Sequence, residues 1–268
     1  MDYSFSKLLN SGVVGNDGAL SVTVPERWMQ GRSTYGGLSA ALCLKAAYQA
    51  SDSLPPLRSA QVSFIGPMGA PLIIKPELLR QGRSVAFVGV DAFELTSGAP
   101  KLATRTVFAF GEARKSQFDE HHLPAPTDLP APEEAPRLFP KGFGPGFAQH
   151  FEPKLARGGL PVSGSDINEH FLWIRHEDKE ASDMPALLAI ADMPPPAMFP
   201  KFTAPAPMSS MTWHINILDD QPTTDDGWWL VRTEAENAKD GYSSQDMTLW
   251  NLGGVPVLSM CQSVTIFT

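Results

Sequence analysis

The feature that most constrains this chain is an apolar segment, Leu187–Ala191, that leaves a helix without any polar face. Ser182 or Asp183 can cap the free backbone N–H groups at its start, and Pro185 is tolerated in the first turn of a helix. Three prolines beginning at Pro194 end the helix. A helix that is apolar all round has to be buried. The sequence therefore predicts that this helix lies inside the protein.

A carboxylate, Asp192, follows this segment directly and stands in an unfavourable place. The negative end of the helix dipole opposes its charge, and apolar surroundings disfavour its ionised form. One interpretation is an exposed aspartate at a frayed helix end. The other is a general base whose pKa is tuned by its surroundings. The second interpretation requires polar partners from elsewhere in the chain.

A second helix buried nearly all round is predicted over Leu38–Ala50, where Lys45 is the only charged residue. Two glycines, Gly36 and Gly37, precede it. Because glycine has no Cβ, another backbone or a ligand can approach the free N–H groups at the start of this helix closely. We therefore expect Gly36 or Gly37 to offer a backbone donor to an oxyanion.

Each helix is followed by four segments that resemble strands. Alternation of apolar residues predicts strands over 57–65, 72–79, 85–93 and 102–110, and again over 211–218, 228–235, 242–250 and 257–267. One more strand is predicted over 167–176, before the second helix. A proline-rich stretch interrupts this pattern, so we predict a first repeat over 1–114, a semi-rigid linker over 115–146 and a second repeat over 147–268.

This order of elements predicts a fold class. An antiparallel sheet has one apolar face, and a single apolar helix laid across that face covers it. Two such units can pair their sheets edge to edge, which also hides exposed strand edges. The expected fold is therefore α+β, a double hotdog in which two tandem repeats each wrap an antiparallel sheet around a long central helix.

Composition limits the partners and the compartment. The formal net charge of -8 argues against nucleic acid as the main partner. No apolar run approaches the roughly 20 residues of a membrane span, and the first residues do not resemble a signal peptide, so we expect a cytoplasmic protein. Cys43 and Cys261 are expected to be buried free thiols. No clustered ligand motif indicates a metal site.

Three short motifs carry a family resemblance. The most specific is Trp173-Ile174-Arg175 followed by the helix that ends at Asp192; the others are Tyr35-Gly36-Gly37 and Gln262 in the last strand. With these motifs, the chain resembles the acyl-CoA thioesterase II-like family, a tandem hotdog, over nearly its whole length apart from the proline linker. The resemblance implies hydrolysis of a fatty or related acyl-CoA to free acid and CoA without a cofactor. It also leads us to expect a homo-oligomer formed through hotdog sheets.

The resemblance also implies catalytic residues. In that family an aspartate, a glutamine and a serine or threonine hold the attacking water, which implies Asp192 as the base and Gln262 as its polar partner. The family's threonine falls close to Met208 in this chain, so Ser209 and Ser210 are the candidates for the hydroxyl, with Thr212 as a further alternative. Direct attack by the carboxylate, which would form an anhydride, is the other mechanism left open.

Four residues are expected to bind the substrate: Tyr35, Gly36 and Gly37 before the first helix, and the basic residue Arg32 near them. Two other functions are compatible with the same fold. A hotdog protein can bind an acyl-CoA or acyl-carrier thioester without hydrolysing it. The segment Ser163–His170 also resembles the Asp-x-Asn…His signature of hotdog enoyl hydratases, with Asp166 and His170 as its acid–base pair, although the His comes one residue early.

Overall fold

The structure, a computed structural model, describes residues 4–95, 98–140 and 142–267. The first half of the chain contains α1 (Phe5–Asn10), β1 (Val13–Val14), β2 (Leu20–Val22), β3 (Met29–Gln30), β4 (Ser33–Thr34), α2 (Gly36–Ala47), β5 (Leu57–Phe64), β6 (Leu72–Gln81), β7 (Val85–Glu94) and β8 (Lys101–Gly111). The second half contains β9 (Phe151–Gly158), β10 (Glu169–His176), α3 (Met184–Ala191), β11 (Met208–Ile217), β12 (Trp229–Lys239), β13 (Tyr242–Asn251) and β14 (Pro256–Ile266).

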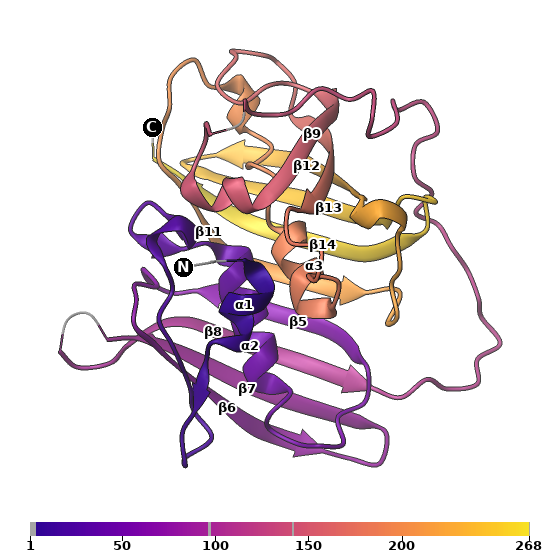
Figure 1. The fold of residues 1–268 in the computed structure, drawn as a ribbon. Coiled ribbons are helices and arrows are strands. Elements are labelled where there is room, and N and C mark those ends of the chain that lie inside the picture. The colour runs from indigo at the N-terminus through magenta and orange to yellow at the C-terminus, as the bar shows by residue number, and fades with distance from the viewer. Residues whose placement is uncertain (1–3, 96–97, 141, 268) are drawn as a thin grey trace.

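Twelve strands form one antiparallel sheet in the order β1-β2-β6-β7-β8-β5-β11-β14-β13-β12-β10-β9 (Figure 1). Read outward from its centre, the order β5-β8-β7-β6-β2-β1 on one side matches β11-β14-β13-β12-β10-β9 on the other. The two halves therefore repeat one plan, and the predicted double hotdog is confirmed. The short strands β1 and β2, the strand β9 and the helix α1 were not predicted, because each is brief or lacks a clear alternation.

The two half-sheets join through their central strands. β5 and β11 pair antiparallel, with Ala60 opposite Ile215 and Val62 opposite Trp213. This pairing satisfies the backbone groups of two strands that would otherwise be exposed edges. The edge-to-edge pairing expected from the sequence is therefore present.

Helices α2 and α3 lie side by side against the sheet, with α1 beside them (Figure 1). Local signals set the limits of α3: Asp183 Oδ1 accepts the backbone N–H of Ala186 at 2.9 Å, and Pro185 occupies the first turn. The prediction of a long helix in both repeats is wrong for α3, which has 8 residues against 12 in α2. The prolines from Pro194 onward, which cannot donate backbone hydrogen bonds, stop it after two turns.

The helices approach most closely at Gly37. A Cβ atom on this residue would lie 2.9 Å from the carbonyl oxygen of Ala189 in α3 and 2.8 Å from the ring of Tyr35. The Tyr35 hydroxyl donates to the same Ala189 carbonyl at 2.7 Å, and its ring stacks on Phe147 with centroids 4.0 Å apart. The absence of a side chain at residue 37 thus lets the two repeats meet backbone against backbone.

The proline-rich segment packs against the second half of the protein through hydrogen bonds and apolar contacts. Apart from one isolated bridge at Arg137 and the start of a 3-10 helix (Gly146–His150) at its end, its described residues form no strand or helix, and the segment runs along the outside of the molecule (Figure 1). The indole N–H of Trp173 donates to the carbonyl of Pro130 at 2.9 Å, and that of Trp250 to the carbonyl of Leu123 at 2.7 Å. The segment therefore covers an apolar cluster that includes Phe171, Trp173, Trp228, Leu230 and Trp250.

The two cysteines differ in exposure. Cys43 is buried in α2, as predicted, whereas the prediction of a buried Cys261 is wrong. β14 alternates, and Met260 and Gln262 face the core, so the intervening Cys261 faces outward. Among the helices of the described ranges, none is long and apolar enough to cross a membrane.

Replacing Gly37 by alanine should destabilise the protein. Alanine normally stabilises a helix by about 0.5–1 kcal/mol relative to glycine. At residue 37 its Cβ would instead meet the Ala189 backbone, and overpacking of this kind costs about 1–3 kcal/mol. Urea unfolding of Gly37→Ala should show this loss in the free energy of unfolding.

Gly36→Ala is the matched control, because the atoms nearest to a Cβ there belong to the side chains of Asp192 and Phe64 and not to the backbone. We expect a smaller loss of stability for it. A Gly37→Ala protein as stable as the wild type would contradict close packing of the two helices at this position.

Candidate active site

The structure brings together the two residues on which the predicted chemistry depends. Asp192 is the C-cap of α3, and Gln262 lies on β14 with its side chain on the buried face of the sheet. Gln262 Nε2 donates to Asp192 Oδ1 at 2.7 Å. A carboxylate and an amide far apart in sequence thus form a direct pair.

The carboxylate of Asp192 also contacts the first half of the chain. The backbone N–H of Gly37 donates a hydrogen bond to it, and a Cβ on Gly36 would lie 2.7 Å from its Oδ2. Asp192 therefore lies at the start of α2, where free N–H groups and the positive end of the helix dipole favour a negative charge. The site is built from both repeats and lies where their helices meet.

Opposing effects set the acidity of Asp192. Burial raises the pKa of Asp192 to about 7, and the hydrogen bonds from Gln262 and Gly37 act in the opposite direction. Burial, together with the charge of Asp192, also raises the pKa of the nearby Tyr35, which therefore stays protonated. The Asp192 side chain is only half-buried, so water can reach it. A carboxylate with a pKa near neutrality can accept a proton at physiological pH.

A second glutamine stands behind this pair. Gln245 on β13 lies directly opposite Gln262, and its Nε2 donates to Gln262 Oε1 at 2.9 Å. Its own Oε1 accepts the backbone N–H of Ala197 at 3.0 Å. Gln245 was not predicted, because its contact depends on the register between β13 and β14, which no local signal fixes.

The hydroxyl candidates divide between the two faces of β11. Ser210 lies opposite Val264, on the same buried face as Gln262, whereas Ser209 lies opposite Thr265 on the other face and is exposed. Thr212 lies opposite Ser263, also on the face away from Gln262. A register shift between Ser210 and Thr212 marks an irregularity in the strand. The structure thus brings Ser210, but neither Ser209 nor Thr212, to the face that carries Gln262.

The expected substrate-binding residues have different surroundings. Tyr35 is 1% exposed and its hydroxyl is bonded to Ala189, so its side chain joins the helices and does not face an open surface. Gly36 is half-buried beside Asp192, and the N–H of Gly37 is used by the carboxylate. Arg32 is exposed in the turn between β3 and β4, shortly before Tyr35.

The residues of the hydratase alternative differ sharply in exposure. Asp166 is exposed, and its backbone carbonyl accepts a hydrogen bond from Lys201. His170 is 1% exposed, and its ring bonds to the backbone of Pro195. Burial lowers the pKa of His170 to about 4, so it stays neutral. An exposed carboxylate and a fully buried imidazole do not make a shared acid–base site.

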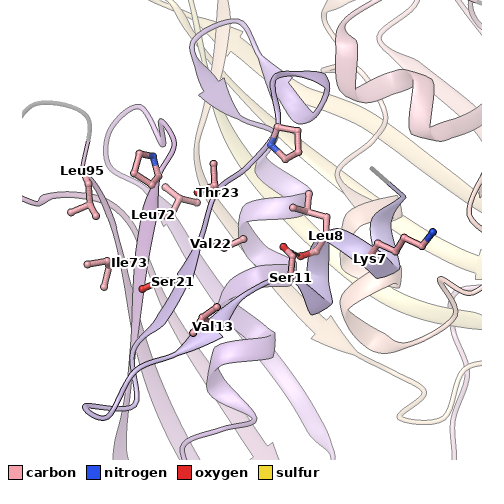
Figure 2. Close-up of a pocket in the computed structure, with 12 residues that line it drawn as sticks. Lys7, Leu8, Ser11, Val13, Ser21, Val22, Thr23, Leu72, Ile73 and Leu95 are labelled. Atoms are coloured by element: carbon pink, nitrogen blue, oxygen red, sulfur yellow. Dashed lines mark hydrogen bonds between the residues drawn. The ribbon is translucent and has the colours of Figure 1, made fainter. Parts of the chain in front are cut away.

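Two cavities lie away from Asp192 and Gln262, and the first is next to the N-terminal helix. It has a volume of about 800 Å³ and lies between α1, β2 and β6, where Leu8, Val22, Leu72 and Ile73 line it (Figure 2). A second cavity of about 540 Å³ adjoins Tyr48 and Asp183, at the opposite end of the helix pair. Neither is lined by Asp192 or Gln262. In the part of the chain that the structure describes, no group of three or more His, Cys, Asp or Glu is placed to hold a metal ion.

Comparison with solved structures shows the same fold in several bacterial proteins. A hot dog fold protein of unknown function from Alicyclobacillus acidocaldarius is 22% identical, with a TM-score of 0.87 over 100% of this chain and 99% of that one. A putative thioesterase II from Thermobifida fusca is 17% identical, with a TM-score of 0.81 over 98% and 97%. An acyl-CoA thioesterase II from Mycobacterium marinum is 17% identical, with a TM-score of 0.76 over 98% of each chain.

Sequence comparisons give the family. A search among curated protein sequences found no significant match. Two protein-family profiles do match the chain: "Acyl-CoA thioesterase N-terminal domain" over residues 24–111 and "Acyl-CoA thioesterase C-terminal domain" over residues 124–266. Together they cover both repeats, including the segments that carry Gly37, Asp192 and Gln262. The chain therefore belongs to the acyl-CoA thioesterase family that these two domains define.

Proposed function

We propose that this protein is a thioester hydrolase that cleaves a fatty or related acyl-CoA to free acid and CoA by water attack. One observation carries the proposal above the others. Asp192, whose pKa burial raises to about 7, is hydrogen-bonded to Gln262 and lies against the start of α2. Burial opposes the charge of this carboxylate while two hydrogen bonds stabilise it, and a carboxylate balanced near neutral pH is suited to act as a general base.

The proposed reaction begins with a water molecule beside Asp192. The carboxylate takes a proton as the water oxygen attacks the thioester carbonyl, and negative charge develops on the carbonyl oxygen. Collapse of the tetrahedral intermediate breaks the carbon–sulfur bond, and the CoA thiolate leaves and is protonated. The backbone N–H of Gly36, which has no acceptor in the described part of the chain, is the donor we assign to the developing oxyanion.

Two further roles follow from exposure and position. Ser210 shares the buried face of Gln262, so we propose that it supplies the hydroxyl that helps to hold the water. Arg32 is exposed near the start of α2, so we propose that it contacts the phosphates of CoA. These assignments replace Ser209 and Tyr35, whose side chains face the opposite side of the sheet and the protein interior, respectively.

We also propose a cytoplasmic location and the division of the chain at 1–114, 115–146 and 147–268. The two family matches, which end at residue 111 and begin again at residue 124, support a boundary between the repeats in this region. A panel of acyl-CoA substrates of different chain length, assayed for thiol release, tests the activity directly. A protein that binds these thioesters but releases no thiol would be the binding module instead.

Asp192→Asn should abolish most turnover without unfolding the protein. Asparagine has nearly the same shape but cannot take a proton, and general bases contribute about 10²–10⁴-fold to rate. Thiol release should fall within that range, while circular dichroism stays that of the wild type. Asp166→Asn is the matched control and should keep full activity. Unchanged turnover in Asp192→Asn would contradict the proposed base.

The rate should depend on pH through Asp192. Because the base must be ionised, kcat/KM should fall tenfold per pH unit below about pH 7, the pKa that burial gives Asp192. Stability supplies a second test. The pKa is higher in the folded than in the unfolded protein, so ionisation of Asp192 costs stability as the pH rises from about 4 to about 7. The Tm of Asp192→Asn relative to wild type should therefore rise across this interval; a constant difference would contradict the raised pKa.

Neighbouring serines provide a matched pair. Ser210→Ala removes a hydroxyl from the face of β11 that Gln262 shares, and Ser209→Ala removes one from the exposed face. We expect Ser210→Ala to lower kcat by about tenfold, the loss of roughly one hydrogen bond in the transition state. Ser209→Ala should be neutral. Equal activity of the two variants would remove Ser210 from the site.

A further inference from the structure

The buried glutamines form a chain of three hydrogen bonds that ends at the carboxylate. The backbone N–H of Ala197 donates to Gln245 Oε1 at 3.0 Å, Gln245 Nε2 donates to Gln262 Oε1 at 2.9 Å, and Gln262 Nε2 donates to Asp192 Oδ1 at 2.7 Å. Each amide carries an acceptor at one end and donors at the other. The chain therefore has a direction.

That direction is fixed by its first member. A backbone N–H can only donate, so the Gln245 atom that faces Ala197 must be the oxygen. The nitrogen of Gln245 then faces Gln262, and the atom it meets must be the Gln262 oxygen. This leaves the Gln262 nitrogen toward Asp192. Both amide orientations thus follow from one main-chain donor.

The first donor of this hydrogen-bonded series, the backbone N–H of Ala197, lies in a well-packed turn. Ala197 is fully buried, and the ring of His170 bonds to the backbone of Pro195 in the same turn. Gln245 is 2% exposed, and its nitrogen also contacts the sulfur of Met247 at 3.8 Å. A flipped Gln245 would leave a buried donor facing the donor of Ala197, which is strongly unfavourable.

We propose that Gln245 is a positioning residue that locks the amide of Gln262, so that only hydrogen-bond donors face Asp192. The consequence for the reaction rests on the proposed function. If Gln262 could flip, its oxygen would accept a hydrogen bond from protonated Asp192 and stabilise the acid form. The lock forbids this arrangement and favours the ionised base. It also occupies Gln262 Oε1, so the second hydrogen on Nε2 remains the free group that Gln262 can offer to a water molecule or the thioester oxygen.

The other groups that face Asp192 would not obscure a change in its pKa. From the first half, Gly36, Gly37 and Phe64 carry no charge, and Tyr35 is buried with its hydroxyl bonded to Ala189. From the second half, Gln262 is neutral. Of the described groups, only Tyr35 titrates beside Asp192, and burial keeps its pKa well above the range of the experiment.

The first test is Gln245→Met, which has a similar shape and no amide. Without the lock, Gln262 can accept from protonated Asp192, so the Asp192 carboxyl should titrate about one pH unit higher. Carbon-13 NMR of the labelled aspartate carboxyl measures this without any activity. The acid limb of kcat/KM should move by the same amount, with the fold unchanged. Gln61→Met, on the exposed face of β5, is the control and should change neither.

The second variant is Gln245→Glu, which keeps the proposal testable if Gln245→Met does not fold. A protonated glutamic acid can still accept from Ala197 and donate to Gln262, whereas its ionised form can only accept. The pH–rate profile of Gln245→Glu should therefore become bell-shaped, losing activity on the alkaline side where the wild type stays flat. A merely structural role would lower activity equally at all pH values.

The outcomes separate the two proposals. If wild type releases no thiol from any acyl-CoA, the proposed function fails, yet the NMR titration still tests the lock. If Asp192 titrates at the same pH in wild type and in folded Gln245→Met, the lock is refuted whatever the activity. The lock is also refuted if the rate of Gln245→Glu stays constant at alkaline pH, as the rate of the wild type does.

Discussion

The contact between the start of α2 and the end of α3 is the constraint on which the rest of the structure depends. Both helices are apolar on nearly all sides, so they pack on one another against the sheet, and they can approach this closely because Gly37 brings no side chain to the Ala189 backbone. The same approach directs a free N–H of α2 at Asp192. Packing and the proposed chemistry therefore use one set of atoms, and neither can be changed without the other.

The two repeats share the same order of strands but differ in the side chains at one pair of matching positions. Thr106 opposes Val90 in the β7–β8 pair, whereas Gln262 opposes Gln245 in the corresponding β13–β14 pair. The first pair has no amide, and the Thr106 hydroxyl donates instead to the Val90 carbonyl at 3.4 Å. One repeat therefore supplies mainly the helix start, and the other supplies the carboxylate and amides. The proposed site therefore lies between the two repeats and takes different groups from each.

Much of the fold could be predicted, since its signals are local. Asp183, Pro185 and Pro194 mark the limits of α3, and alternation marks the long strands. Asp192 stood out from its own neighbours, but its pairing with Gln262 came from a family resemblance. Gln245 and the choice between Ser209 and Ser210 depend on strand register and on the irregularity in β11, which no single segment encodes. The alternation predicted for the last strand also places Cys261 on the outer face, although its thiol was expected to be buried.

The segment between the repeats has a consequence for how the chain can be divided. Its carbonyl groups at Leu123 and Pro130 accept the indole hydrogens of Trp250 and Trp173, on the outer side of the second half-sheet. A second repeat produced without this segment would expose a row of aromatic rings and leave two indole donors to water. The covalent connection between the repeats is thus also part of the outer wall of one of them, and the length of this segment is limited by the surface it has to cover.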